Sequence, residues 1–158
     1  PLLYKTKPIR LFMKPYEALS RAIKLATAMH EHQFRENGEP YILHCIRVMQ
    51  KFSDPMIKTV AILHDIIEDT IVNIEDLHTA GFDEDIVALV ELLTKRDGEE
   101  YFDYLARLSL NPIARQVKMA DLEDNLDILQ LGMLDVRRVN RMAKYLKAYR
   151  GLEGISNV

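Results

Sequence analysis

The sequence predicts an all-α fold, and three observations favour it. Glycine and proline are scarce, with 6 residues of each among 158, so few residues interrupt helices. Apolar residues recur with a spacing of about 3.6 through most of the chain, and no segment alternates polar and apolar residues for long. We expect one compact domain over residues 1–158, with its core over about 16–150, built as a bundle of about six to eight helices.

Several helix boundaries are marked by residues that favour helix caps. Asp54 and Asn111 each precede a proline, which is favoured in the first turn of a helix. Asn73 and Asp76 have the spacing of a capping box, and Asp83 can cap the helix after it. The predicted helices cover about residues 16–35, 41–53, 55–69, 73–81, 84–95, 99–110, 112–131 and 135–150.

Composition and charge exclude several classes of protein. The apolar content of 48% excludes wholesale disorder, and no apolar run approaches the ~20 residues of a membrane span. A formal charge of −3 gives no reason to expect a nucleic-acid partner. The single cysteine, Cys45, excludes an intrachain disulfide and a cysteine-rich zinc site. The N-terminal residues are broken by Lys, Arg and Pro and are no signal peptide, so we expect a cytoplasmic protein.

The predicted helix over 55–69 combines an apolar surface with an unusual group of polar residues. Apolar residues cover most of its circumference, so it should be buried. Burying three acids close together costs on the order of several kcal/mol each unless a positive charge lies beside them. A divalent cation is the simplest such charge, because His and Asp are among its natural ligands. On a continuous helix, neighbouring rows of one stripe would carry His64, Asp65, Glu68 and Asp69.

Further ligands for such a cation would have to come from other helices. His44 and Asp121 each stand as a polar residue within an apolar stretch. Their separations from the His64–Asp65 pair place them on different helices, so a bound metal would join three helices. Taken alone, His44 could be a satisfied interior histidine, and Asp121 could be a salt-bridge partner of Lys118.

The order of these residues resembles the HD superfamily of metal-dependent phosphohydrolases, in which a histidine, a His-Asp pair and a distant aspartate follow one another. The closer resemblance is to the hydrolase domain of the RelA/SpoT family of alarmone enzymes and its small stand-alone relatives of the Mesh1 type. It covers about residues 16–150. The segments that carry it are His30-x-His32-Gln33-x-Arg35-x-x-Gly38-x-Pro40-Tyr41-x-x-His44, Leu63-His64-Asp65-x-x-Glu68-Asp69-Thr70, Leu93-Thr94-Lys95 and Lys118-x-Ala120-Asp121-x-x-x-Asn125.

This resemblance implies a (p)ppGpp 3′-pyrophosphohydrolase with an HD-type helical bundle and a metal site between helices. No synthetase activity is expected, because the chain has no room for the nucleotide-synthesising domain of the long family members. The implied metal, usually Mn²⁺, would be held by four ligands, and two acids would activate water. The implied ligands are His44, His64, Asp65 and Asp121, the acids are Glu68 and Asp69, and the implied substrate contacts are Arg35, Asn125 and Tyr101.

The phosphates of a nucleotide also need cationic partners, since the site is otherwise acidic. Lys118 lies three residues before Asp121, on the same helical face, and Lys95 and Arg35 are further candidates. The basic run over 137–150 is interpreted as an exposed helix face, with an oligomer contact as the alternative. The sequence decides neither the oligomeric state nor the choice of metal among Mn, Fe, Co and Zn.

The chain departs from the family at positions that bear on substrate recognition. Glu36 stands where a basic residue is common, Leu122-Glu123-Asp124 where Arg-Leu-His is frequent, and Cys45 where proline is usual. None of these positions is an implied metal ligand. Two alternatives therefore stay open. One is an HD phosphatase acting on another nucleotide or phosphomonoester, such as the 2′-phosphate of NADPH, and the other is a regulatory domain that binds metal or nucleotide without turnover.

Overall fold

The computed structural model describes residues 14–130 and 133–155. These residues form helices and a single antiparallel β-bridge between Phe34 and Pro40, so the predicted all-α fold is confirmed. None of the described helices is long and apolar enough to cross a membrane. In chain order the elements are α1 (Pro15–Met29), α2 (Tyr41–Gln50), α3 (Pro55–Leu63), α4 (Ile66–Asp69), α5 (Ile74–Thr79), α6 (Glu84–Leu93), α7 (Tyr101–Ser109), α8 (Pro112–Asn125), the 3₁₀ helix η1 (Ile128–Gln130) and α9 (Val136–Glu153).

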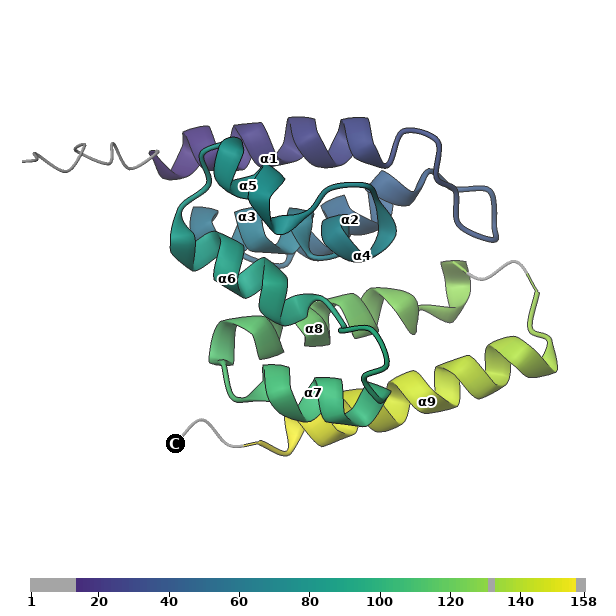
Figure 1. Ribbon diagram of the computed structural model, residues 1–158. Helices are drawn as coiled ribbons and strands as arrows, with labels where there is room; N and C mark the ends of the chain where they lie inside the picture. Colours follow the sequence, from purple (N-terminus) through teal and green to yellow (C-terminus); the bar gives the residue numbers. More distant parts are fainter. Residues whose placement is uncertain (1–13, 131–132, 156–158) are drawn as a thin grey trace, which may run out of the picture.

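Helix α8 lies at the centre of the arrangement (Figure 1). It packs against α2, α3 and α6 on one side and against α7 and α9 on the other. Helices α1 and α2 both pack against α3, so the first half of the chain forms one layer and α7–α9 the second. Helix α3 fits the predicted burial of this segment, because its buried residues are Thr59, Val60, Ala61, Ile62 and Leu63.

Most of the predicted helix caps are present in the structure. The carboxylate of Asp54 and the side-chain oxygen of Asn111 each accept hydrogen bonds from two backbone amides of the following first turn. Asn73 and Asp76 form the predicted capping box. Asp83 stands at the N-cap of α6, as predicted, but its side chain accepts no capping hydrogen bond.

The first predicted helix ends six residues early, at Met29 rather than 35. Backbone amides after Met29 form hydrogen bonds across the loop instead of along a helix. Arg35 N donates to Glu39 O at 2.8 Å, and Tyr41 N donates to Gln33 O at 2.9 Å. Gly38 makes this return possible through its positive φ of 85°. The loop between α1 and α2 therefore folds back on itself. Its hydrogen bonds and the turn at Gly38 outweigh the apolar spacing that predicted a longer helix.

Two later boundaries also differ from the prediction. Helix α8 ends at Asn125 rather than near 131, because Asp127 accepts hydrogen bonds from Leu129 N and Gln130 Nε2 and turns the chain into η1. Helix α9 continues through Gly151 to Glu153. A glycine ends a helix when it adopts positive φ, and the positive-φ glycines of the described residues do not include Gly151.

The helix predicted over 55–69 is broken into α3 and α4, and the break falls at the His-Asp pair. Asp65 leaves the helical region, with φ −103° and ψ 1°. Successive side chains of a regular helix diverge by about 100°, so two adjacent residues cannot point at one atom. The break removes this restriction and lets His64 and Asp65 converge.

Candidate metal centre and active site

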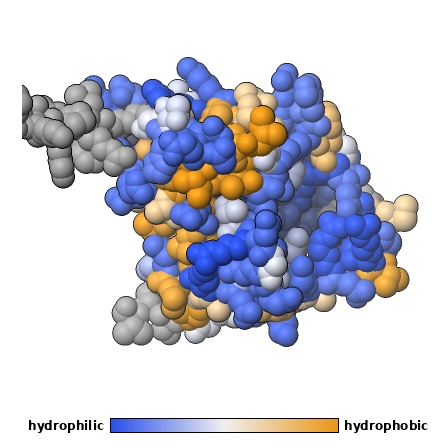
Figure 2. Space-filling model, viewed as in Figure 1, coloured by the Kyte–Doolittle hydropathy of each residue, from blue (hydrophilic) through white to orange (hydrophobic). Residues whose placement is uncertain are grey.

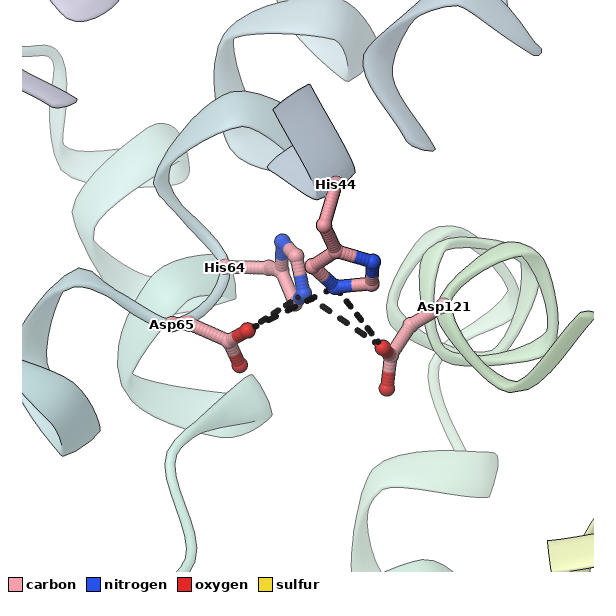
Figure 3. Close-up of side chains that lie close together, drawn as sticks. All are labelled: His44, His64, Asp65 and Asp121. Atoms are coloured by element: carbon pink, nitrogen blue, oxygen red, sulfur yellow. Dashed lines mark ion pairs between the residues drawn. The ribbon is translucent and has the colours of Figure 1, made fainter. Parts of the chain in front are cut away.

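Four side chains from distant parts of the chain meet where α2, α8 and the α3–α4 junction come together (Figure 3). His44 comes from α2, Asp121 from α8, and His64 and Asp65 from the junction. One nitrogen or oxygen atom of each side chain lies within 4.8 Å of the others. The three-helix meeting expected from the sequence separations is therefore present.

The spacing of these atoms suits a divalent cation. His64 Nε2 lies 2.9 Å from Asp65 Oδ2, and His44 Nε2 lies 3.2 Å from Asp121 Oδ1. The longer cross distances are 3.7 Å for His44 to Asp65 and 3.6 Å for His64 to Asp121. A cation about 2.1 Å from every ligand holds neighbouring ligand atoms about 3 Å apart. The four atoms need only small movements to surround such an ion.

The tautomers of both histidines also favour a metal. His64 Nδ1 lies 2.8 Å from the carbonyl oxygen of Ala61 and must donate to it, since a carbonyl only accepts. His44 Nδ1 lies 2.7 Å from Asp124 Oδ2. Both Nε2 atoms are buried, and among the described residues neither has a hydrogen-bond partner. In their neutral form both rings therefore direct an Nε2 lone pair at two carboxylates, which is the donor set of a metal site.

The charges of the cluster also favour a metal site. Burial alone would raise the pKa of Asp121, but Lys118, with Nζ 2.7 Å from Oδ2, and both histidines hold it well below its usual range. Burial would likewise raise the pKa of Asp65, yet His64 lowers it to about 2. Both carboxylates are therefore ionised at neutral pH, as metal ligation requires.

Tyr41 belongs to the same cluster, although no role for it was predicted from the sequence. Its hydroxyl donates to Asp65 Oδ2 at 2.5 Å. Burial, followed by the charge of Asp65, raises the pKa of Tyr41, so the phenol keeps its proton. The signal was present in the sequence, because Tyr41 lies three residues before His44 and therefore on the same face of α2.

Glu68 and Asp69 lie on α4, beside the four clustered side chains. Both line the same cavity as Asp65 and Asp121. Burial is the main cause that raises the pKa of Glu68 and of Asp69 above their usual values. One oxygen of Glu68 accepts a hydrogen bond from Lys95 N at 3.1 Å, which fixes the carboxylate against the loop after α6. A partly desolvated, oriented carboxylate of this kind suits proton transfer.

The cavity has a volume of about 460 Å³, which is large enough for a nucleotide. The surface around the hollow on the right of Figure 2 is mostly hydrophilic. Every predicted substrate contact lines the cavity, namely Arg35, Lys95, Tyr101, Lys118 and Asn125. The interpretation of 137–150 as an exposed face was wrong in part, because α9 also contributes lining residues: Arg138, Arg141, Lys144 and Tyr145.

Arg35 is held along the cavity wall by residues near the end of α8. Its Nη1 donates to Asp124 Oδ2 at 2.8 Å, and its Nη2 donates to Asn125 Oδ1 at 3.1 Å. Asn125 Nδ2 in turn donates to Asp121 Oδ1 at 2.6 Å. Hydrogen bonds therefore connect the guanidinium to the candidate ligand on α8.

Comparison with known proteins agrees with this geometry. A family model described as an HD domain matches residues 22–143, which include all four clustered side chains. The chain belongs to the HD domain family. The HD domain is 40% identical over 83 residues to a guanosine-3′,5′-bis(diphosphate) 3′-pyrophosphohydrolase of Borreliella burgdorferi, covering 50% of the chain and 12% of that relative.

Two further comparisons extend over more of the HD domain. A protein of the same name from Aquifex aeolicus is 31% identical over 125 residues, covering 72% of this chain and 18% of the relative. The chain thus spans less than a fifth of the length of these curated relatives. A solved structure, described as a metazoan ortholog of SpoT that hydrolyzes ppGpp, has a TM-score of 0.75 and 25% identity and matches 92% of this chain and 90% of its own. The predicted resemblance to the alarmone hydrolases is confirmed.

Proposed function

We propose that the HD domain is a metal-dependent phosphohydrolase that removes pyrophosphate from the 3′ position of a guanosine nucleotide such as (p)ppGpp. The observation that carries the proposal is the convergence of four candidate ligands and two acids in one cavity. The names of the two relatives supply the substrate class. The cavity's basic side chains supply the charge that a nucleotide's phosphates need.

In this proposal His44, His64, Asp65 and Asp121 hold one divalent cation, with Mn²⁺ as the first candidate and Fe²⁺, Co²⁺ or Zn²⁺ as alternatives. When bound, the cation supplies Lewis-acid activation of a water molecule and of a phosphoryl oxygen. The ligand set of two imidazoles and two carboxylates is compatible with all four metals. The metal must therefore be identified by analysis of protein purified without a metal-affinity tag.

The remaining side chains are assigned to proton transfer and to substrate binding. Glu68 accepts a proton from the attacking water, because its raised pKa brings it closer to neutral pH than an exposed carboxylate. Asp69 lies beside it and orients the water. Lys118 and Lys95 oppose the charge of the phosphates, and Arg35 presents its guanidinium to the base, with Tyr101 and Asn125 as further contacts.

A release assay tests the proposal. The Mn²⁺-loaded HD domain is incubated separately with guanosine 3′,5′-bis(diphosphate), NADPH and GTP, while pyrophosphate and orthophosphate are measured. Pyrophosphate released from the first substrate alone supports the proposal. Orthophosphate released from NADPH favours the phosphomonoester alternative, and metal binding without any turnover favours the regulatory alternative. His64→Ala should abolish metal binding and turnover together. His32→Ala is the matched control, since its side chain is 93% exposed.

A further inference from the structure

Helix α9 builds one wall of the cavity. Arg138, Arg141 and Lys144 are spaced three residues apart, so they share one face of this helix, and all three line the cavity. The Lys144 ammonium lies 4.3 Å from the centroid of the Tyr101 ring. This wall therefore concentrates three positive charges in a cavity that is also lined by Asp65, Glu68, Asp69 and Asp121.

One carboxylate, from the loop between α1 and α2, neutralises part of that wall. Glu36 Oε2 accepts a hydrogen bond from Arg138 Nε at 2.6 Å, and Oε1 accepts one from Arg141 Nη2 at 3.0 Å. The two arginines lower the pKa of Glu36, so the carboxylate is charged at neutral pH. Because each carboxylate oxygen accepts a hydrogen bond from a different guanidinium, the single Glu36 side chain pairs with both arginines.

This arrangement matters for phosphate binding. A guanidinium binds a carboxylate and a phosphate through the same N–H groups and with the same charge attraction. The Arg138 side chain is only 16% exposed, so the room around it for a second anion is limited. A nucleotide phosphate that reaches α9 must displace Glu36 or tolerate a carboxylate beside it.

We propose that Glu36 is a specificity-determining residue that makes the cavity favour nucleotides with few phosphates at the 5′ position. The inference rests on the proposed function, in which the 3′-diphosphate lies at the candidate metal ligands and the base lies beside Arg35. The 5′ group then reaches the wall formed by α9. Glu36 repels each added phosphate and occupies the arginines that would bind it, so a 5′-monophosphate is accepted more readily than a 5′-diphosphate or triphosphate.

Steady-state kinetics test this proposal on guanosine 3′-diphosphates that carry one, two or three 5′-phosphates. Wild type should show the highest kcat/KM with the 5′-monophosphate. In Glu36→Gln, KM for the 5′-diphosphate and triphosphate should fall about threefold to tenfold relative to the 5′-monophosphate, with kcat unchanged. Glu31→Gln removes the same charge from an exposed side chain of the same loop, and its KM ratios should match wild type.

A binding measurement separates failure of this inference from failure of the proposed function. Calorimetry on chelator-treated protein gives Kd for GMP and for GDP without any turnover. The ratio of Kd for GDP to Kd for GMP should fall about threefold to tenfold in Glu36→Gln. If wild type hydrolyses no 3′-diphosphate, the proposed function fails and this ratio alone decides the role of Glu36. An unchanged ratio, equal changes for both nucleotides, or no binding of either by both proteins overturns the inference.

Discussion

His44 donates its Nδ1 proton to Asp124 over 2.7 Å, and this bond fixes which nitrogen the ring presents to Asp121. Asp124 has its pKa lowered against burial by His44 and Arg47, so it is ionised and can only accept. The same carboxylate accepts hydrogen bonds from Arg35 and from Arg47. One residue therefore orients a candidate metal ligand and anchors the cavity wall.

Replacing Asp124 by asparagine should weaken metal binding about 10-fold to 100-fold while the protein stays folded. An amide is a weaker acceptor than a carboxylate, so His44 would be less firmly held in the tautomer that exposes Nε2. Calorimetric titration of the metal-free protein with Mn²⁺ measures the change. Glu123→Gln is the matched control, because Glu123 bonds to Lys51 and Tyr149 instead. Equal affinity in wild type and Asp124→Asn would contradict the assignment.

Much of the fold and part of the site could be predicted because the signals are local. Asp54 and Asn111 stand directly before prolines, and a cap depends only on the few residues around it. His44 and Asp121 were found because a polar side chain inside an apolar stretch requires a partner. Their placement in one cluster with the His64–Asp65 pair followed from the residue order and from the resemblance to a family.

Other features depend on contacts that no local pattern records. Neither glycine nor proline marks the break between α3 and α4, and the apolar spacing continues through it. Arg138 and Arg141 have the pattern of an exposed helix face. They line the cavity because α9 packs against α7 and α8 and meets the loop that carries Glu36, and these long-range contacts leave no local pattern in the sequence.

Replacing Glu68 by glutamine should leave metal binding intact and lower kcat about 10²-fold to 10⁴-fold. The amide oxygen can still accept the hydrogen bond from Lys95 N, so the loop keeps its place, but the side chain can no longer take a proton. Metal content and single-substrate kinetics are measured together. Glu75→Gln removes an exposed acid of α5 and should keep full activity. Full activity in Glu68→Gln would show that another group takes the proton.

Removing the metal should destabilise the protein, and the effect should shrink in acid. With free metal at about 100 times Kd, binding adds about 3 kcal/mol to the free energy of unfolding. Despite burial, the nearby Asp121 carboxylate and the hydrogen bond to Asp124 raise the pKa of His44, so protons compete with the metal as pH falls. Tm is measured with Mn²⁺ and with chelator between pH 8 and pH 5. The difference between the two Tm values should shrink as the pH approaches 5. Asp121→Asn should show little metal-dependent shift at any pH.

Enlarging Ala22 should destabilise the packing of α1 against α3. Ala18, Ala22 and Ala26 form the buried face of α1, and Ala22 is 0% exposed. A leucine there has no space, so Ala22→Leu should cost about 1–3 kcal/mol in the free energy of unfolding. Ala28→Leu adds the same atoms on the exposed side of α1 and should change it by less than about 0.5 kcal/mol. Urea denaturation compares the two, and equal effects would contradict the packing described.

The loop that carries Lys95 should lose a stabilising contact as pH falls. Glu99 accepts hydrogen bonds from Arg107 Nε at 2.7 Å and from Arg96 N at 2.9 Å, and these bonds lower the pKa of Glu99 from 4.5 to about 2. A carboxyl whose pKa is lower in the folded protein stabilises it fully above its unfolded pKa and loses this effect as pH falls through the folded pKa. The Tm difference between wild type and Glu99→Gln should therefore be largest above about pH 5 and shrink steadily towards pH 2. Glu100→Gln, next to it and exposed, should show no such trend. A difference that stays constant over this range would mean that Glu99 stabilises the loop by packing rather than by charge.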